Sequence, residues 1–497
     1  MTKSKRAPRN VRLKLQYRAI MAYWGLTLSL IGATMLFPLL VLAAWPAEAR
    51  LAVHFIIPAA ALTGGGTWLY FRWRPKEAVL TLQDGGLIVV LSWAAACLAG
   101  AWPLMALENL SFTQAMFESV SGWTTTGLSV VDVTTAQHLT LLWRSTMQVV
   151  GGAGFAIIMV AALTGHAGAG LPSAEGRSEQ LVPHVRESAK LVLLIYVSYL
   201  TVGMVAYWLA GMSFFDAVNH AFAAVSTGGF STKAESIGYW DSVAVEAVSL
   251  PLMLLGNLNF LTAYMLWRGR VRAAGRDSEV RMLALLVPMV AMLLLLLVTR
   301  QLYPTMSKSV RVAIFETVSC LTTTGFSTVS YSNWNSFGIF VLIVFMIMGG
   351  GTGSTAGGMK QYRVFLLAKS IYWEVRRSLL PSSAVVENYA WHSGQQDYVS
   401  DARLRQTGSF VFLYFLTFAA GAAILTAHGT PLPEALFEFA SAQGTVGLSI
   451  GVTTPDAPTL VLWTQIAGMF LGRLEFIVVF SSVLKLGRDL PNLVSGR

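Results

Sequence analysis

FETVSCLTTTGFST, residues 315–328, decides the fold of this chain because variants of it occur three more times. They are FESVSGWTTTGLSV at 117–130, NHAFAAVSTGGFST at 219–232 and FEFASAQGTVGLSI at 437–450. Self-similarity at a spacing of roughly one hundred residues indicates a structure built from repeated units. Aligned without gaps, the four stretches superimpose one glycine that is followed by Leu or Phe and then Ser: Gly127, Gly229, Gly325 and Gly447.

The composition of the chain places these repeats in a membrane. Of 497 residues, 55% are hydrophobic and 12% are charged, whereas ordinary soluble proteins carry about 25% charged residues. Apolar stretches of about 20 residues recur along the chain and are long enough to cross a bilayer, which excludes a soluble enzyme. We predict ten spans, at residues 20–44, 52–71, 86–107, 140–164, 189–210, 243–267, 282–302, 335–370, 408–428 and 459–484.

The basic residues predict the orientation of these spans. Residues 2–18 contain seven Lys and Arg and no acidic residue, which is typical of a cytoplasmic anchor rather than a cleaved signal. Ten crossings then leave both termini in the cytoplasm, and the net charge of +10 needs no nucleic-acid partner. Most basic residues lie in the loops predicted to be cytoplasmic. The segments predicted to be outside hold only about six: Arg50, Arg144, Lys233, Arg300, Lys308 and Arg311.

Each repeated stretch falls between a span that leads outward and one that leads back. A half-length apolar helix followed by a Thr/Gly turn in that place predicts a re-entrant pore loop. Irregular backbone at membrane depth is tolerated only inside protein or beside water, so the four turns should enclose one pore. We therefore expect an all-α integral membrane protein with ten transmembrane helices and four re-entrant pore loops in pseudo-four-fold membrane-pore-membrane repeats. The expected units are an N-terminal two-helix segment (1–75), pore repeat 1 (76–185), pore repeat 2 (186–278), pore repeat 3 with a broken gating helix (279–400) and pore repeat 4 (401–497).

The Thr/Gly turns have the residue types that an ion filter needs. A filter aims backbone carbonyls at a dehydrated ion, uses Gly for unusual dihedral angles and adds oxygen ligands from Thr. Oxygen ligands suit hard cations, and the C-terminal ends of the short helices exclude anions, so we expect a monovalent cation as substrate. One TTTG alone is more often a capped turn, but the four related turns TTTG, STGG, TTTG and GTVG in matched positions favour a filter. The predicted filter residues are Thr125, Thr126, Gly127, Thr227, Gly228, Gly229, Thr323, Thr324, Gly325, Thr445, Val446 and Gly447.

A polar residue lies nine positions before each glycine, inside the apolar half-helix. Three of these residues are the carboxylates Glu118, Glu316 and Glu438, and the fourth is His220. A carboxylate is expensive at membrane depth unless it is hydrogen-bonded or faces water. We expect these residues to support the filter backbone. There are two weaker alternatives. These side chains contact the ion directly, or His220 and the glutamates form a metal site.

A Gly-rich run at residues 349–358 interrupts the long eighth span. The phosphate-loop template fails there because its lysine, Lys360, comes one place late. The run therefore predicts a break in a helix that begins near Asn335 and resumes after Met359, although a packing kink remains an alternative. The glycines predicted to form a gate are Gly349, Gly350, Gly351, Gly353, Gly357 and Gly358.

Arg473 is a basic residue deep in the last predicted span. An arginine at that depth costs several kcal/mol unless it faces protein or water, so a functional role is the default expectation. The plain structural alternative is an ion pair, for which Glu475 lies two positions further on.

With these motifs the chain resembles the TrkH/TrkG/KtrB superfamily of bacterial potassium uptake proteins. The four turns carry the resemblance, together with LGNLNF (255–260), MGGGTGSTAGGMKQYRV (348–364) and GMFLGRLEFIVVF (468–480). The two extra N-terminal spans are similar to those of the TrkH branch. The resemblance implies potassium selectivity, a homodimer, and a cytosolic ring of nucleotide-binding regulatory subunits of the RCK type. It also implies that the Gly-rich run obstructs the pore, with Arg473 beside it and Lys360 at its end.

These observations together predict channel-like potassium uptake across the bacterial inner membrane, with membrane lipid as surroundings and no enzymatic step. Single glycines stand where tetrameric potassium channels have GYG, so sodium passage is left open. Coupling to protons or sodium is also left open, and no cofactor is expected in this chain beyond potassium as substrate. One alternative is a cation-coupled secondary transporter of an organic solute, which also uses broken helices but normally has two repeats. An intramembrane hydrolase would need a Ser/His or paired Asp constellation that the spans do not offer.

Overall fold

The computed structural model describes residues 9–74, 80–154, 185–381, 387–392 and 394–494. Over these residues the chain is helical apart from one antiparallel hairpin, in which β1 (Tyr389–His392) pairs with β2 (Gln395–Tyr398). The chain is a multi-pass membrane protein, because six of the described helical segments are long and apolar enough to cross a bilayer. These segments are Leu13–Ala43, Pro46–Trp73, Gln83–Glu108, Lys190–Leu209, Ser278–Leu302 and Asp401–Ala427.

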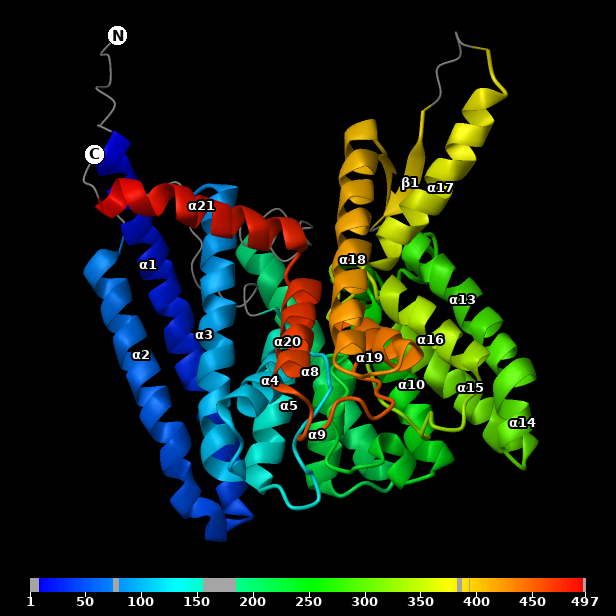
Figure 1. The fold of residues 1–497 in the computed structure, drawn as a ribbon, viewed down its shortest axis with the longest axis horizontal. Helices are drawn as coiled ribbons and strands as arrows, with labels where there is room; N and C mark the ends of the chain where they lie inside the picture. Colours follow the sequence, from blue (N-terminus) through cyan, green and yellow to red (C-terminus); the bar gives the residue numbers. More distant parts are fainter. Residues whose placement is uncertain (1–8, 75–79, 155–184, 382–386, 393, 495–497) are drawn as a thin grey trace.

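An N-terminal helix pair stands at one edge of the molecule (Figure 1). Gly25 and Gly66 bring its two helices together, since a Cβ on either glycine would lie within 3.0 Å of the carbonyl oxygen of the other. Small residues at such crossings allow the close packing on which membrane helices depend. The pair consists of α1 (Arg9–Thr34), η1 (Phe37–Ala43), η2 (Pro46–Ala52) and α2 (Val53–Trp73).

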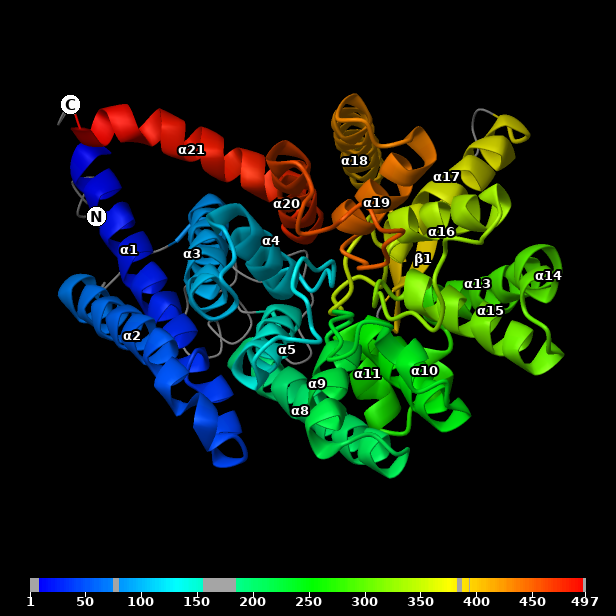
Figure 2. The ribbon, with the colours of Figure 1, turned by 60° about the horizontal axis from the view of Figure 1, so that its bottom comes forward.

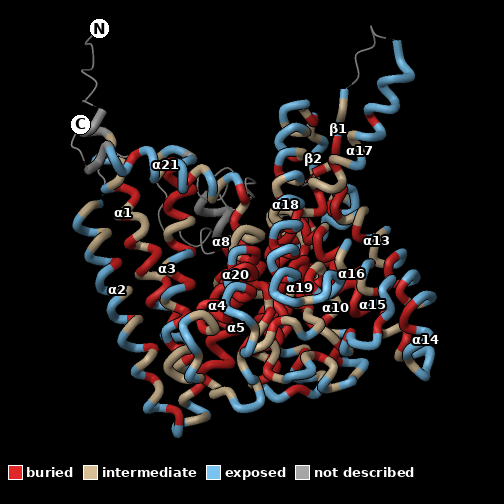
Figure 3. Tube along the Cα trace, viewed as in Figure 1, coloured by how far each residue is buried: buried red, intermediate tan, exposed pale blue. Residues whose placement is uncertain are grey.

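Four short helices, largely buried, each end at a Thr/Gly turn, and the four turns meet near the centre of the molecule (Figures 2 and 3). Polar N-caps start three of them: the side chains of Ser111, Ser213 and Thr305 accept a backbone N–H three residues on. Each short helix has a longer helix before it and another helix after it. In chain order the elements are α3 (Leu82–Glu108), α4 (Phe112–Trp123) and α5 (His138–Gly152); α8 (Val185–Leu209), α9 (Phe214–Val225), η3 (Ser236–Tyr239) and α10 (Val243–Asn257); α13 (Ser278–Leu294), η4 (Leu295–Thr299), α14 (Arg300–Leu302), α15 (Met306–Leu321) and α16 (Ser336–Met348); and α18 (Asp401–Ala427), α19 (Leu432–Gly444) and α20 (Thr459–Arg473).

Three predicted spans are broken in the structure. The break expected in the eighth is present, because α16 ends at Met348 and α17 (Gln361–Ser378) begins after the Gly-rich loop. The spans predicted at 243–267 and 459–484 were expected to be continuous, and here the structure differs. The chain bends by 118° between α10 and α11 (Phe260–Trp267), and by 102° between α20 and α21 (Phe476–Val494). Each bend falls where polar residues interrupt the apolar run, at Asn257 and Asn259 in the first and at Arg473 and Glu475 in the second.

The bend after α20 sends α21 across the ends of α1 and α3 instead of onward in the direction of α20 (Figure 1). Lys485 of α21 is buried and pairs with Asp84 of α3 at 2.8 Å, which anchors the C-terminal helix. A four-residue helix, α12 (Val271–Ala274), follows α11. The second part of the predicted span 140–164 lies outside the described residues.

Candidate functional site

The four Thr/Gly turns, residues 125–127, 227–229, 323–325 and 445–447, share one backbone conformation. The first residue of each turn is a threonine in the left-handed region, and the third is a glycine with positive φ. Left-handed backbone costs a non-glycine residue about 1–2 kcal/mol, so it persists only where the surroundings enforce it. The φ angles are 55°, 51°, 54° and 49° for Thr125, Thr227, Thr323 and Thr445, and 95°, 76°, 78° and 97° for Gly127, Gly229, Gly325 and Gly447.

The preceding short helix holds each turn in the same way. The backbone N–H of the middle residue donates to a carbonyl five residues earlier, at 2.8–2.9 Å in all four copies. In the first and fourth turns a serine hydroxyl also accepts the glycine N–H, at 3.0 Å from Ser121 to Gly127 and from Ser441 to Gly447. The backbone N–H groups of the turns are therefore hydrogen-bonded to the ends of the preceding helices. Because all four turns are held in this way, all four adopt the same strained backbone conformation.

The four turns touch one another in a closed ring. A Cβ on Gly127 would lie within 3.0 Å of the carbonyl oxygen of Gly228, and each later glycine stands in the same relation to the next turn. The fourth turn meets the first, so the ring closes. The glycine-to-carbonyl neighbours are Gly127 with Gly228, Gly229 with Thr324, Gly325 with Val446, and Gly447 with Thr126. The structure thus brings all twelve residues predicted for the filter into one place.

The carboxylates nine positions before the glycines bind the backbone that leaves each turn. Glu118 accepts the N–H of Val130 at 2.9 Å, and Glu316 accepts that of Thr328 at 2.8 Å. Glu438 likewise accepts the N–H of Ile450 at 3.2 Å. All three side chains are fully buried. Their acceptor oxygens meet backbone and hydroxyl donors, which favours structural support over direct contact with an ion.

His220 takes the corresponding position in the second unit. Its Nδ1 lies 2.8 Å from the carbonyl oxygen of Asp216 and must donate to it. Nε2 of the neutral ring is then an acceptor, and the hydroxyl of Ser231 lies 2.9 Å away. Asp216 itself accepts the hydroxyl of Thr232 at 2.5 Å. A metal site built from His220 and the glutamates gains no support, since the described residues contain no group of three His, Cys, Asp or Glu side chains that could hold a metal ion.

Arg144 was expected in an outer segment, but the structure buries it within α5, where only 2% of the residue is exposed. Its Nε donates to Glu118 at 2.6 Å, and its Nη1 donates to the carbonyl of Ser231 at 3.2 Å. The guanidinium also lies 4.0 Å from the ring centroid of Phe230. Arg144 therefore links the first unit to the second. The signal that singled out Arg473, a cation inside an apolar helix, was available for Arg144 as well.

Gln148, one helical turn after Arg144, also supports the second turn. Its Nε2 donates to the carbonyl of Gly228 at 2.5 Å, and its Oε1 accepts the N–H of Phe230 at 3.3 Å. Because the side chain brackets this turn from α5, it fixes a turn of the neighbouring unit. No feature of the local sequence indicates such a contact.

The Gly-rich loop, residues 349–358, packs directly against the turns. The N–H of Gly357 donates to the hydroxyl of Thr323 at 2.9 Å, and the hydroxyls of Thr355 and Thr227 are 3.1 Å apart. A Cβ on Gly357 would also collide with the side chain of Thr445. The loop thus reaches three of the four left-handed threonines. Its conformation uses positive φ at Gly349, Gly353 and Gly358, and at Lys360 just beyond it.

Neighbouring helices satisfy the backbone that this loop frees. The bend between α10 and α11 supplies Asn257, whose Oδ1 accepts the N–H of Gly351 at 2.9 Å. Glu279 of α13 accepts the N–H groups of Thr352 and Tyr362 at 2.7 and 3.2 Å. One carboxylate therefore holds the loop and the first turn of α17 together. In the sequence Glu279 is indistinguishable from an ordinary acidic residue in the first turn of a helix.

Arg473 and Lys360 both donate to carbonyl oxygens of the loop. Arg473 donates to the carbonyl of Thr355, and also to that of Gly151 at the end of α5, at 2.7 Å. Lys360 donates to the carbonyl of Ala356 at 2.5 Å. The alternative of an ion pair with Glu475 is wrong, because Glu475 binds Arg363 of α17, which lies 2.7 Å from both carboxylate oxygens. Arg473 is thus a tether between the loop and α5.

Comparison with known proteins identifies related sequences and a solved structure with a similar fold. The sequence profile of the TrkH family, described as a cation transport protein, matches residues 53–486. The Trk system potassium uptake protein TrkH of Halomonas elongata is 33% identical and the match covers 94% of this chain and 98% of that protein; TrkH of Escherichia coli K12 is 32% identical, with 93% and 97% covered. The crystal structure of the potassium transporter TrkH from Vibrio parahaemolyticus superimposes with a TM-score of 0.83, at 30% identity, over 94% of this chain and 98% of that one.

Proposed function

Because this chain belongs to the TrkH family of cation transport proteins, we propose that it admits potassium ions to the cell through the ring of four Thr/Gly turns. Within that family it is a potassium uptake transporter and not an enzyme. The observation that carries the proposal is the closed ring, in which each glycine lies against a carbonyl of the next turn. A ring of backbone carbonyls is the arrangement that replaces the hydration shell of a potassium ion.

The shared strain of the turns supports a filter. Left-handed threonines alternate with positive-φ glycines in every copy, and such alternation redirects successive carbonyls relative to an ordinary turn. In this proposal Glu118, His220, Glu316 and Glu438 hold the backbone so that the carbonyls keep their spacing. Arg144 adds a second layer of support by fixing Glu118.

The architecture that we propose around this filter has ten transmembrane helices and four pseudo-four-fold repeats. The order of the elements supports it, since every short helix and turn is enclosed by two helices of one unit. The broken pairs α10–α11, α16–α17 and α20–α21 each count as one transmembrane span in this scheme. Both termini lie in the cytoplasm of a bacterial cell and the protein resides in the inner membrane, as the basic N-terminal segment favours.

The Gly-rich loop and Arg473 form the gate of the proposed pathway. The loop contacts Thr227 and Thr323 directly, so it occupies the space beneath the ring. Arg473 holds the loop by the Thr355 carbonyl and places a positive charge beside the path, where it opposes the entry of a cation. Lys360 adds a second cation at the end of the loop. Opening therefore requires the release of the Arg473 contact.

We further propose that the protein works as a homodimer with a cytosolic RCK-type nucleotide-binding subunit. The resemblance of its motifs supports both partners. The Gly-rich loop supplies what such a subunit needs, an element with alternative positions whose balance a bound partner can shift. Potassium is the substrate, and the chain itself needs no cofactor.

Reconstitution of the purified chain into liposomes tests this function. We expect potassium and rubidium flux down an imposed gradient, faster than sodium flux and independent of any added organic solute. Flux that depends on an organic solute would favour a coupled secondary transporter instead. A folded protein without potassium flux, with the Gly-rich loop intact or shortened, would overturn the proposal.

A further inference from the structure

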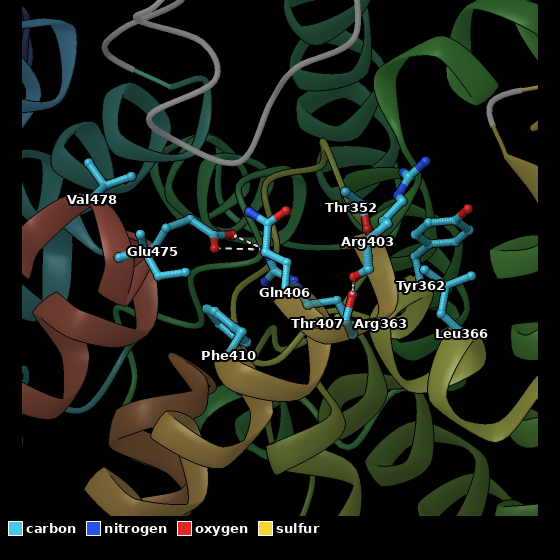
Figure 4. A pocket seen from close by; sticks show the side chains of 11 residues that line it. Thr352, Tyr362, Arg363, Leu366, Arg403, Gln406, Thr407, Phe410, Glu475 and Val478 are labelled. Atoms are coloured by element: carbon cyan, nitrogen blue, oxygen red, sulfur yellow. Dashed lines mark hydrogen bonds and ion pairs between the residues drawn. The ribbon is translucent and has the colours of Figure 1, made fainter. Parts of the chain in front are cut away.

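A cavity of about 320 Å³ lies beside the Gly-rich loop, among α17, α18 and α21 (Figure 4). Thr352 of the loop forms part of its wall, next to Tyr362 and Arg363 at the start of α17. Gln406 of α18 and Glu475, just before α21, line it as well. The cavity therefore adjoins the loop and both helices that resume the chain after a break. Its volume lies at the lower end of the range of small-molecule sites.

The charges around the cavity favour an anion. Three ionised side chains line it: Arg363, Arg403 and Glu475. Arg363 and Glu475 form an ion pair, with 2.7 Å between Nη2 and Oε2, so their charges neutralise each other. Arg403 lies with its guanidinium 5.3 Å from the ring centroid of Tyr362, and no carboxylate in the described part of the chain pairs with it. The lining residues alone therefore carry one net positive charge, while the carboxylate of Glu279 lies behind the wall, bound to the N–H groups of Thr352 and Tyr362.

The hydrogen-bonding groups point to the same class of ligand. Arg403 offers a planar set of N–H donors, and the amide of Gln406 adds another donor. Tyr362 is only 3% exposed and its ring stacks on that of His392 at 3.9 Å, so it forms part of the wall and is not one of the donors. A phosphate group, with several acceptor oxygens and a negative charge, suits guanidinium donors better than any neutral ligand does.

We propose that this cavity binds a small phosphate-bearing anion through Arg403 and Gln406, and that the bound anion competes with Glu475 for Arg363. Arg363 lies with its guanidinium 3.9 Å from the ring centroid of Phe410, so it is already held at the cavity wall. A phosphate that reaches Arg363 would weaken the contact between α17 and Glu475. Since Glu475 lies two residues after Arg473, this change bears on the tether of the Gly-rich loop. The effect on the gate rests on the function proposed above, whereas the binding site does not.

A free phosphate compound and the phosphate of a lipid headgroup share this chemistry. Binding is measured first, with the full chain in zwitterionic nanodiscs and radioactive inorganic phosphate as the probe. A second set of nanodiscs contains phosphatidylglycerol and no free phosphate, with the thermal midpoint of unfolding as the readout. Saturable phosphate binding assigns the site to soluble anions, and stabilisation that Arg403→Gln removes in phosphatidylglycerol alone assigns it to lipid. Absence of both effects overturns the site.

Arg403→Gln should weaken phosphate binding at least about tenfold, as loss of one charged hydrogen-bonding group does. Arg405→Gln is the matched control, because Arg405 is an exposed arginine of the same helix that does not line the cavity. Equal affinity in both variants would overturn the assignment. If Arg403→Gln does not fold, Gln406→Leu replaces it, with a smaller loss expected.

The effect on the gate is tested by flux. Phosphate on the cytoplasmic side should raise potassium flux in the unaltered protein and in Arg405→Gln, but not in Arg403→Gln. Binding without a change in flux would overturn the competition with Glu475 while leaving the site in place. Binding in a protein that carries no potassium under any condition would overturn the proposed function alone.

Discussion

Arg473 of α20 donates a hydrogen bond to the backbone carbonyl of Thr355 in the Gly-rich loop. The same guanidinium donates to the carbonyl of Gly151 in α5, so one side chain joins the loop to the first unit. Thr355 in turn donates its hydroxyl to the carbonyl of Gly256 at 2.8 Å, beside the bend of the second unit. The position of the loop therefore depends on three units of the chain at once.

Arg473→Ala should raise basal potassium flux about tenfold, because it removes two charged hydrogen bonds to the loop and a repelling charge. Shortening the Gly-rich loop should raise flux as well. The double variant should gain less than the product of the two, since both changes act on one barrier. Flux into liposomes measures all three, with Arg300→Ala at an exposed helix end as the control. Unchanged flux in a stable loop deletion would refute the gate.

Gly229→Ser should reduce the preference for potassium over sodium about tenfold. Gly229 has a φ of 76°, which costs a side chain about 1–2 kcal/mol, and the new Cβ would collide with the carbonyl of Thr324. Both effects disturb carbonyls of the ring. Ion competition in liposomes measures the ratio. Gly65→Ser is the matched control, because a Cβ there meets nothing within 4 Å. An unchanged ratio in folded Gly229→Ser would exclude the second turn from the filter.

Glu316→Gln should be tolerated better than Glu316→Ala. Gln keeps an acceptor for the N–H of Thr328, whereas Ala leaves that donor buried and unpaired at a cost of about 1–3 kcal/mol. The thermal midpoint of unfolding and the flux at equal expression measure the difference. Glu434, which is exposed in the first turn of α19, provides the same two substitutions as a control. If Gln and Ala are equally harmful, Glu316 acts through its charge and not through its shape.

Arg144→Met should destabilise the protein by about 3–5 kcal/mol, because it leaves the carboxylate of Glu118 buried without its partner. Combining it with Glu118→Gln should restore part of that loss, since no unpaired charge then remains. Unfolding in detergent measures the cycle of two single variants and one double variant. Arg300→Met serves as the exposed control. Strict additivity would mean that the two residues do not interact in the folded protein.

Asp241 should contribute a pH-dependent part of the stability. A hydrogen bond from Lys308, and a further one from Arg311 at 3.0 Å, lower the pKa of Asp241 from its ordinary value of 3.8. Because the folded pKa lies below the unfolded one, the ionised group stabilises the fold above about pH 4. The contribution is lost as the pH falls through the folded pKa. Asp241→Asn should therefore flatten the decline of the unfolding midpoint with acid, and Asp456→Asn should not. An unaltered decline in Asp241→Asn would contradict this.

Local signals predicted the parts of the site that a short stretch of sequence determines. The four Thr/Gly turns, the polar residues nine positions before each glycine and the helix break after Met348 were all readable in this way. Their physical causes, left-handed backbone, a buried carboxylate and a run of glycines, act within a dozen residues.

The remaining parts depend on contacts between distant segments. The burial of Arg144 follows from the approach of Glu118 and Ser231, and the anchoring role of Glu279 from the approach of the Gly-rich loop. Glu475 pairs with Arg363 because the start of α17 meets the bend between α20 and α21, and it does not pair with its sequence neighbour Arg473. Polar residues on both sides of Leu258 and Leu474 interrupt the apolar runs there, but the angle of each bend depends on tertiary packing.

The contact of Gly447 with the carbonyl of Thr126 also has a consequence for biosynthesis. These two residues are separated by most of the chain, so a ribosome has produced three complete units before the last side of the ring exists. Contacts of such long range form late and slowly. During translation the first three turns are therefore in the bilayer before the fourth turn, which completes the ring, has been synthesised. A chain released before residue 447 would therefore reach the membrane with an incomplete ring, and quality control has a clear structural difference by which to recognise it.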